Sequence, residues 1–199
     1  MQLIGLTGGI GMGKSTAAAA FRRARIPVFD ADATVHRLQA RGGRAVRAIA
    51  NAFPGTEIGG AIDRGRLRAL VVHDTAALRR LEKIIHPLVQ AEQRGFIARA
   101  RRQGCSMAVL DVPLLFETGA DKRVDYIISV SAPRSVQRHR VRLRRRMTDS
   151  EIDAIIARQV SDRHRRRHSD LVIRTGLSRY EAIRTIRRFL ASVSASMKH

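Results

Sequence analysis

A glycine-rich octapeptide at residues 8–15, Gly-Gly-Ile-Gly-Met-Gly-Lys-Ser, constrains the fold more than any other feature of this chain. It fits the pattern G-x-x-x-x-G-K-[ST], with Gly8, Gly13, Lys14 and Ser15 at the fixed positions. Glycines let consecutive backbone N–H groups turn inward around an anion, since no Cβ blocks the approach. Lys14 supplies a cation for the β- and γ-phosphates, and the Ser15 hydroxyl suits Mg²⁺. The motif predicts a binding site for a nucleoside triphosphate.

The residues that flank the loop agree with this interpretation. Residues 3–7 form a short apolar run typical of a buried strand, and the alanine-rich residues 15–23 suit a helix whose N-terminus faces the anion. A chance match in a glycine-rich turn is the alternative. It does not explain why strand, loop and helix follow one another in the required order.

Four further short apolar runs predict strands at residues 26–29, 107–112, 125–130 and 170–173. Because helical segments separate them, we predict an α/β fold with a five-stranded parallel sheet and helices on both faces. The run at 107–112 contains Asp111, the pattern of a Walker B acid that contacts Mg²⁺ through water.

Two carboxylates, Asp30 and Asp32, follow the second predicted strand. Ligands bind at the carboxyl edge of such sheets, so both acids are expected beside the phosphate loop. Their side chains share a face if the strand persists through Asp32. The alternative is a helix N-cap at Asp30 followed by a solvated acid, and the sequence leaves both open.

Residues 34–103 read as mostly helical, and this stretch is longer than an ordinary crossover between strands. Part of it is therefore predicted to form a separate substrate-holding lobe. Asp74 is expected to cap a helix that continues through Ile85. His86 and Pro87 are expected to start another helix that ends near Gly104.

Residues 137–168 form a highly basic stretch, interpreted as a helical pair that acts as a mobile lid. Thr148 with Glu151 forms a capping box, and the same device recurs at Ser178 and Glu181. Arginines stand at positions 140, 142, 144, 145 and 146. Arg140 and Arg144 lie four residues apart and therefore share a helix face, so they are the candidates for contact with a triphosphate.

The length of 199 residues fits one domain, and the net charge is +21. Only four of the 38 basic residues are lysines, and the arginines are spread along every predicted helix, so the charge indicates compositional bias and no specific nucleic-acid partner. No apolar run is long enough for a membrane span, and a cytoplasmic location is expected. The lone Cys105 excludes an internal disulfide, and no histidine is assigned to a metal.

Several motifs occur together in an order that resembles the dephospho-coenzyme A kinase family. They are residues 6–16, Val-Phe-Asp-Ala-Asp at 28–32, His-Pro at 86–87, Pro-Leu-Leu-Phe-Glu at 113–117, Gln159 and Asp-Leu-Val-Ile at 170–173. The resemblance covers nearly the whole chain. It implies a single P-loop kinase-like domain over residues 1–199, with a helical CoA-binding region at about 33–103 and a lid at about 137–168.

The resemblance also implies ATP-dependent phosphorylation of the ribose 3′-hydroxyl of dephospho-CoA, the final step of coenzyme A biosynthesis, with Mg²⁺ as cofactor. A monomer or weak homo-oligomer is expected. Three residues are implied as catalytic: Asp32 as the proton acceptor, Lys14, and Arg140 as the lid arginine. The implied ATP-binding residues are Gly11, Met12, Gly13, Lys14, Ser15 and Thr16. Asp30, His86 and Glu117 are implied on the acceptor side, and Ser15 and, through water, Asp111 at the metal.

The chain departs from the family pattern at two places. Arg145-Arg146 replaces Asp-Gly in the lid, and Arg174 replaces an acid after the last strand. The first concerns the geometry of lid closure, and the second concerns the adenine side of the ATP site.

Three other functions are alternatives to this interpretation. Another small-molecule P-loop kinase, acting on a nucleoside, nucleotide or shikimate-like alcohol, is the nearest. A regulatory GTPase is disfavoured because the sequence has no N-K-x-D and no D-x-x-G element. A basic nucleic-acid-binding ATPase would be recognised by stimulation of its hydrolysis by RNA or DNA.

Overall fold

The computed structural model describes residues 1–72, 74–145, 148–157, 159–176 and 178–196, the side chains of residues 144 and 145 excepted. Two compact units make up the chain. The first, the core unit, comprises Met1–Phe29 and Ala100–His199, and the second, the helical unit, comprises Asp30–Arg99. The helical unit includes most of residues 34–103, the stretch that the sequence predicts to be mostly helical.

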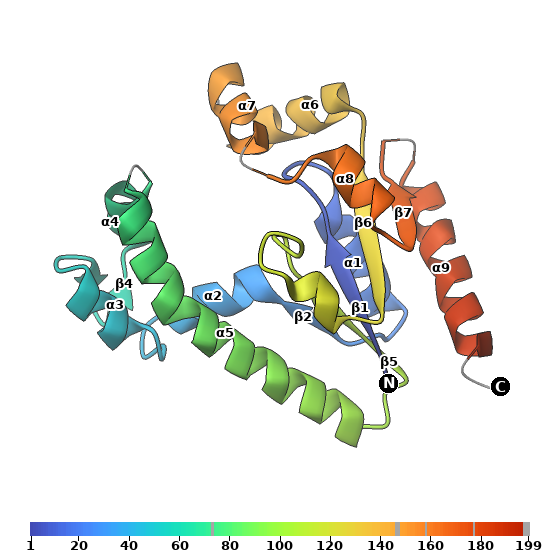
Figure 1. Ribbon diagram of the computed structural model, residues 1–199, viewed down its shortest axis with the longest axis horizontal. Helices are drawn as coiled ribbons and strands as arrows, with labels where there is room; N and C mark the ends of the chain where they lie inside the picture. Colours follow the sequence, from blue (N-terminus) through green and yellow to red (C-terminus); the bar gives the residue numbers. More distant parts are fainter. Residues whose placement is uncertain (73, 146–147, 158, 177, 197–199) are drawn as a thin grey trace. The chain divides into compact units, whose positions relative to one another are not determined.

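A five-stranded sheet has the order β2-β5-β1-β6-β7 (Figure 1). Its strands are β1 (Gln2–Thr7), β2 (Val28–Asp30), β5 (Met107–Asp111), β6 (Tyr126–Ser131) and β7 (Leu171–Arg174). The central strand β1 pairs in parallel with both β5 and β6, and β6 pairs in parallel with β7. All five residues of β5 are buried, as expected for a strand covered on both faces. The predicted α/β sheet is confirmed.

Helices α1 (Lys14–Arg23) and α9 (Arg179–Ser196) contribute to the main core with one face of this sheet. That core includes Leu6, Phe21, Ile128, Val130 and Ile186. Side chains alternate along a strand, so Ser129 and Ser131 point to the other face. There the Ser131 hydroxyl donates a 2.8 Å hydrogen bond to Asp162 of α8 (Asp162–Arg167).

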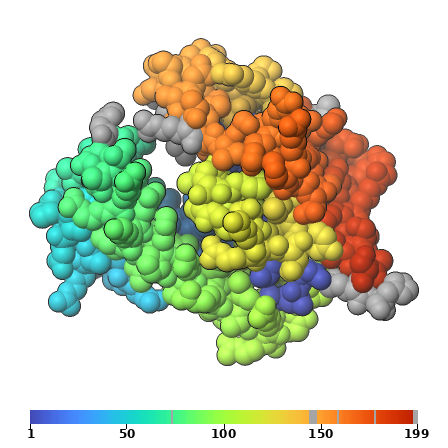
Figure 2. Space-filling view, in the orientation of Figure 1, coloured from blue at the N-terminus to red at the C-terminus, as the bar shows by residue number. Residues whose placement is uncertain are grey.

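The basic stretch forms three helices, α6 (Arg134–Arg145), α7 (Asp149–Ala157) and α8, where the sequence predicts two. Figure 2 shows their residues as neighbouring surfaces coloured gold to orange. The capping box at Thr148 and Glu151 is confirmed, and at Ser178 and Glu181 the N-cap hydrogen bond is confirmed. The Thr148 N–H donates to Glu151 at 2.8 Å, and the Glu151 N–H donates to Thr148 at 3.4 Å. The Ser178 hydroxyl accepts from the Glu181 N–H at 3.0 Å.

The helical unit contains α2 (Ala31–Gln39), α3 (Val46–Ala52), α4 (Arg64–Val71) and most of α5 (Thr75–Arg102). It also contains a short hairpin of β3 (Glu57–Ile58) and β4 (Ala61–Ile62), which the sequence analysis does not predict. Each strand has only two residues, too few for an alternating pattern, although the intervening Gly59-Gly60 is a hairpin signal.

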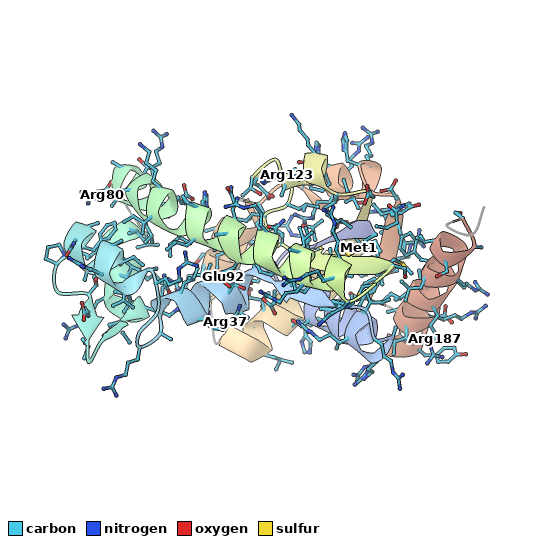
Figure 3. The ribbon with its side chains drawn as sticks, turned by 90° about the horizontal axis from the view of Figure 1, so that it is seen from below. Met1, Arg37, Arg80, Glu92, Arg123 and Arg187 are labelled. Atoms are coloured by element: carbon cyan, nitrogen blue, oxygen red, sulfur yellow. The ribbon has the colours of Figure 1, made fainter. Side chains whose placement is uncertain are left out.

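The predicted break at His86 and Pro87 is wrong, because α5 runs continuously through Pro87 (Figure 3, where Arg80 and Glu92 are labelled on it). Pro87 removes one backbone hydrogen bond. Apolar side chains on both sides of it pack into the same core, and this burial offsets the loss. They are Leu81, Ile84, Ile85, Leu88 and Val89. The predicted cap is confirmed, since Asp74 accepts from the N–H groups of Ala76 and Ala77.

Candidate functional site

The phosphate loop adopts the geometry that its sequence predicts. Gly11 has φ 73° and Gly13 has φ 91°, both in the left-handed region that favours glycine. Gly13 also caps α1, and its carbonyl accepts from the N–H groups of Thr16 at 3.0 Å and Ala17 at 3.3 Å. The loop therefore leads directly from β1 into a helix N-terminus, the arrangement that binds anionic phosphates.

Lys14 forms an ion pair with Asp111, with 2.5 Å between Nζ and Oδ1. The exposed fractions of the two side chains are 17% and 4%. The strand order places Asp111, at the end of β5, beside the loop that follows β1. Ser15 is exposed in the first turn of α1. The hydroxyl and carboxylate groups predicted for Mg²⁺ thus lie close to the lysine in the core unit.

Two glutamines hold the tip of the loop at Ile10. The Gln159 side-chain oxygen accepts from the Ile10 N–H at 3.1 Å, and the Gln137 side-chain nitrogen donates to the Ile10 carbonyl at 2.8 Å. Gln137 is on α6 and Gln159 precedes α8. Helix α6 and the segment before α8 are therefore both hydrogen-bonded to the phosphate loop.

Arg140 of α6 contacts the loop through Thr175. Its guanidinium donates to the Thr175 hydroxyl at 3.1 Å and to the Thr175 carbonyl at 2.7 Å, and it makes a long contact of 3.5 Å with the Gly11 carbonyl. The Thr175 hydroxyl in turn donates to the Met12 carbonyl at 2.5 Å. A Cβ at Gly11 would lie 2.7 Å from the Gln137 carbonyl, so only glycine allows this approach of α6.

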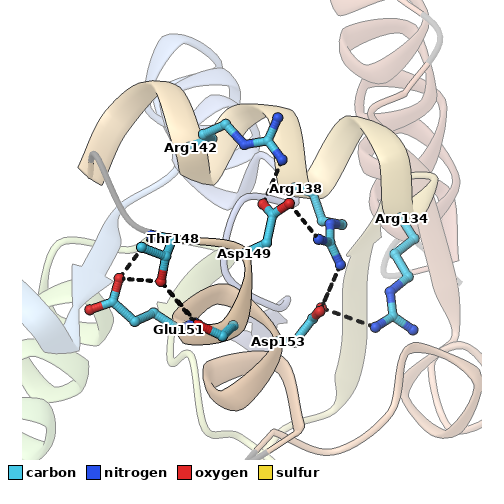
Figure 4. A network of polar contacts seen from close by, with 8 residues as sticks. Arg134, Arg138, Arg142, Thr148, Asp149, Glu151 and Asp153 are labelled. Carbon is cyan, nitrogen blue, oxygen red and sulfur yellow. Dashed lines mark hydrogen bonds and ion pairs between the residues drawn. The ribbon is translucent and has the colours of Figure 1, made fainter.

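Three other arginines of α6, Arg134, Arg138 and Arg142, point toward acids of α7 (Figure 4). Arg138 forms ion pairs with Asp153 at 2.8 Å and with Asp149 at 3.1 Å. Arg134 also pairs with Asp153, at 3.1 Å, and Arg142 pairs with Asp149, at 2.5 Å. These pairs lower the pKa of Asp149, mainly through Arg142, and of Asp153, mainly through Arg134. They also raise the pKa of Arg138, chiefly through Asp153.

Part of the predicted arginine set lies outside the described residues. The side chains of Arg144 and Arg145 are not described, and neither is Arg146. The pairing of Arg140 with Arg144 on one helix face and the effect of Arg145-Arg146 on lid closure therefore stay predictions.

Glu117 is exposed, and its Oε1 accepts from the Val160 N–H at 3.0 Å. This contact joins the loop after β5 to the segment that leads into α8. Arg165 of that helix is 4% exposed, and its guanidinium donates to the Val160 carbonyl. Its burial lowers its pKa.

The helical unit holds the other predicted residues. Asp30 caps α2, since its Oδ1 accepts from the Ala33 N–H at 2.9 Å. The strand therefore ends at Asp30, and Asp32 is exposed in the first helical turn. Of the two alternatives that the sequence leaves open, the structure shows the helix N-cap at Asp30 followed by an exposed acid, and the strand does not persist through Asp32. His86 is exposed on α5.

Arg174, the second departure from the family pattern, is exposed at the end of β7. It borders two hollows beside α8, of about 570 and 560 Å³. Arg166 lines both hollows with it. Residues 8–15, all of them described, are not among the lining residues.

Sequence reasoning missed Thr175 and Arg165 and gave no role to Gln137. Their partners in the phosphate loop are more than a hundred positions away in the chain. A local pattern cannot reveal such contacts. Within the described residues, no helix is both long and apolar enough to cross a bilayer, and no group of three or more His, Cys, Asp or Glu side chains is arranged for a metal.

Comparison with known proteins adds a family assignment to this geometry. A family model described as dephospho-CoA kinase matches residues 2–179. A dephospho-CoA kinase of Rhodopseudomonas palustris strain BisB18 is 46% identical over 98% of this chain and 96% of its own length. A dephospho-CoA kinase of Paramagnetospirillum magneticum is 55% identical over 83% of this chain and 78% of its own.

Two solved structures are similar to this chain in fold. The crystal structure of TT1252 from Thermus thermophilus superposes with a TM-score of 0.83 at 31% identity, covering 96% of both chains. A dephospho-CoA kinase from Campylobacter jejuni gives a TM-score of 0.65 at 17% identity, covering 96% of this chain and 97% of its own. At that identity the second likeness concerns the fold alone.

Proposed function

The chain belongs to the dephospho-CoA kinase family, and we propose that it transfers the γ-phosphoryl group of ATP to the ribose 3′-hydroxyl of dephospho-CoA. The products are CoA and ADP, and the reaction is the final step of coenzyme A biosynthesis. The observation that carries the proposal is the phosphate loop with Lys14 at its end and Asp111 beside it. The family membership supplies the acceptor.

At the phosphate side, we assign the binding of ATP to residues 11–16. Phosphoryl transfer requires in-line positioning and neutralisation of the charge on the transferred group. Backbone N–H groups of the loop and the Lys14 ammonium supply the positive charge that neutralises it. Arg140 is positioned against the Gly11 carbonyl and Thr175, from which its guanidinium can turn to the triphosphate.

The residues present fit a Mg²⁺ ion. Ser15 offers an exposed hydroxyl and Asp111 offers carboxylate oxygens beside Lys14, and oxygen ligands of this kind suit a hard divalent cation that retains several waters. A bound ion would supply positive charge that offsets the negative charge of the phosphate oxygens. We assign Ser15 to direct contact and Asp111 to contact through water.

At the acceptor side, we propose Asp32 as the base that takes the proton of the ribose hydroxyl. Its carboxylate is exposed in the first turn of α2, whereas Asp30 uses an oxygen to cap that helix. A carboxylate within hydrogen-bond reach of the hydroxyl is sufficient for this role. Asp30, His86 and Glu117 are assigned to binding of dephospho-CoA.

The proposed residue roles lead to proposed roles for larger segments of the chain. We propose that the region at about 33–103 binds the CoA moiety, that residues at about 137–168 act as the lid, and that both belong to one kinase domain over residues 1–199. We further propose a cytoplasmic enzyme that is a monomer or a weak homo-oligomer and has no specific nucleic-acid partner.

An acceptor panel tests the proposed function. ATP consumption is followed with Mg²⁺ and dephospho-CoA, a nucleoside, a nucleotide or shikimate, and kcat/KM is compared among them. We expect dephospho-CoA to exceed the others by about three orders of magnitude or more, as for a site that binds its acceptor through several polar contacts. A higher kcat/KM for any other acceptor would reassign the substrate.

A further inference from the structure

One arginine of α8 differs from its neighbours. Arg163, Arg166 and Arg167 are exposed, whereas Arg165 is only 4% exposed and is buried within the core unit. Burial of a guanidinium is costly unless hydrogen bonds and opposite charge compensate it. The contacts of Arg165 therefore show how far its buried charge is compensated.

The Arg165 guanidinium lies against the phosphate loop. Its Nη2 is 4.0 Å from the Met12 sulfur, and a Cβ at Gly9 would come within 2.9 Å of the same nitrogen. Its Nη1 donates to the Val160 carbonyl, while Glu117 accepts from the N–H of Val160. Arg165 thus connects the segment before α8 with the loop.

The charge of Arg165 is incompletely compensated. Its Nε is buried and has no hydrogen-bond partner. Among the described residues, no carboxylate oxygen lies within 4.0 Å of its guanidinium, and Asp162 and Glu117 act on it only at longer range. A positive charge with little water around it acts over a longer distance than a solvated one. The phosphates of a nucleotide on the adjacent loop would supply the missing negative charge.

We propose that Arg165 is a positioning residue for ATP, which holds the Gly9–Met12 turn of the phosphate loop and contributes a buried positive charge that favours triphosphate over diphosphate. The proposal rests on the proposed function in so far as ATP binds this loop. It requires no contact between Arg165 and the nucleotide. Arg165 acts on nucleotide binding through the position of the loop and through the electric field of its guanidinium.

Three variants test it. Arg165→Met removes the charge at similar length, Arg165→Lys keeps the charge, and Arg187→Met, at an exposed arginine of α9, is the control for loss of a surface charge. The dissociation constants of MgATP and MgADP are measured by calorimetry without acceptor, and kcat and KM follow with dephospho-CoA. For Arg165→Met we expect ATP binding to weaken about tenfold and ADP binding to weaken less. Arg165→Lys should restore most of the preference for ATP over ADP, and Arg187→Met should change neither dissociation constant.

Several results would overturn the proposal. They are unchanged ATP affinity in folded Arg165→Met, equal losses for ATP and ADP, or an Arg165→Lys protein as impaired as Arg165→Met. If Arg165→Met does not fold, Arg165→Lys is compared with wild type, and an altered ATP-to-ADP preference in that charge-preserving protein contradicts the role of charge. Wild-type protein that binds ATP but does not phosphorylate dephospho-CoA would refute the proposed function and leave this proposal standing.

Discussion

The phosphate side and the acceptor side of the proposed site differ in how far the protein itself fixes them. In the phosphate loop, Ile10 is held by two glutamines, Lys14 by Asp111 and the Met12 carbonyl by Thr175. In the helical unit, Asp32 and His86 are exposed. We infer that protein contacts hold the nucleotide site in place, whereas Asp32 and His86, in their proposed roles, are accessible to the acceptor; Asp30 and Glu117 already accept hydrogen bonds from the protein.

The largest expected effect comes from breaking the fixed side. Lys14→Ala should abolish measurable phosphoryl transfer, because it removes the cation for the β- and γ-phosphates. It also removes the lysine partner of Asp111, so the free energy of unfolding should fall by about 1–3 kcal/mol. Turnover is measured in a coupled assay and stability by denaturant unfolding. Lys83→Ala, an exposed lysine on α5, is the control, and near-normal turnover of Lys14→Ala would remove the loop from the mechanism.

The acceptor side is tested by separating its two carboxylates. Asp32→Asn should lower kcat by about 10²–10⁴-fold, the range for loss of a general base, with dephospho-CoA still bound. Asp30→Asn keeps a good N-cap and should mainly raise the KM for dephospho-CoA. Both are measured at saturating ATP. A larger fall in kcat for Asp30→Asn would exchange the two roles.

Helix α6 provides a finer comparison, since Arg140 contacts the phosphate loop and Arg142 pairs with Asp149. Arg140→Ala should lower kcat by about 10–100-fold, the value of hydrogen bonds to charged groups, with a smaller loss of ATP affinity. Arg142→Ala should leave kcat unchanged. If Arg140→Ala weakens ATP binding and kcat/KM equally at constant kcat, its role is in ground-state binding.

The smallest effect concerns the outer ion pairs of α6 and α7. The pKa values of Asp149 and Asp153 lie below their ordinary value of 3.8 in the folded protein, so their pairs contribute stability above that pH and lose it as pH falls through the lowered values. The Tm of wild type should exceed that of Asp153→Asn slightly and by a constant amount between about pH 5 and 7. The two values should begin to converge as the pH falls below about 4. A difference that disappears by about pH 5 would contradict the lowered pKa values.

Local patterns predicted much of the fold. The phosphate loop, the five strands and the caps at Asp74, Thr148 and Ser178 each depend on residues within a few positions, and all are confirmed. The expected helix break at Pro87 is wrong because burial on both sides of the proline outweighs one lost hydrogen bond. The roles of Thr175 and Arg165 depend on contacts across more than 150 positions, which no local pattern contains.

The most direct test of the proposed function identifies the atom that is phosphorylated. Wild-type protein is incubated with ATP, Mg²⁺ and dephospho-CoA, and the products are analysed by phosphorus NMR. We expect one new phosphomonoester on the ribose 3′-oxygen, formed in equal amount with ADP and absent with Lys14→Ala. ADP formed without a phosphomonoester, or a phosphate on any other oxygen, would contradict it.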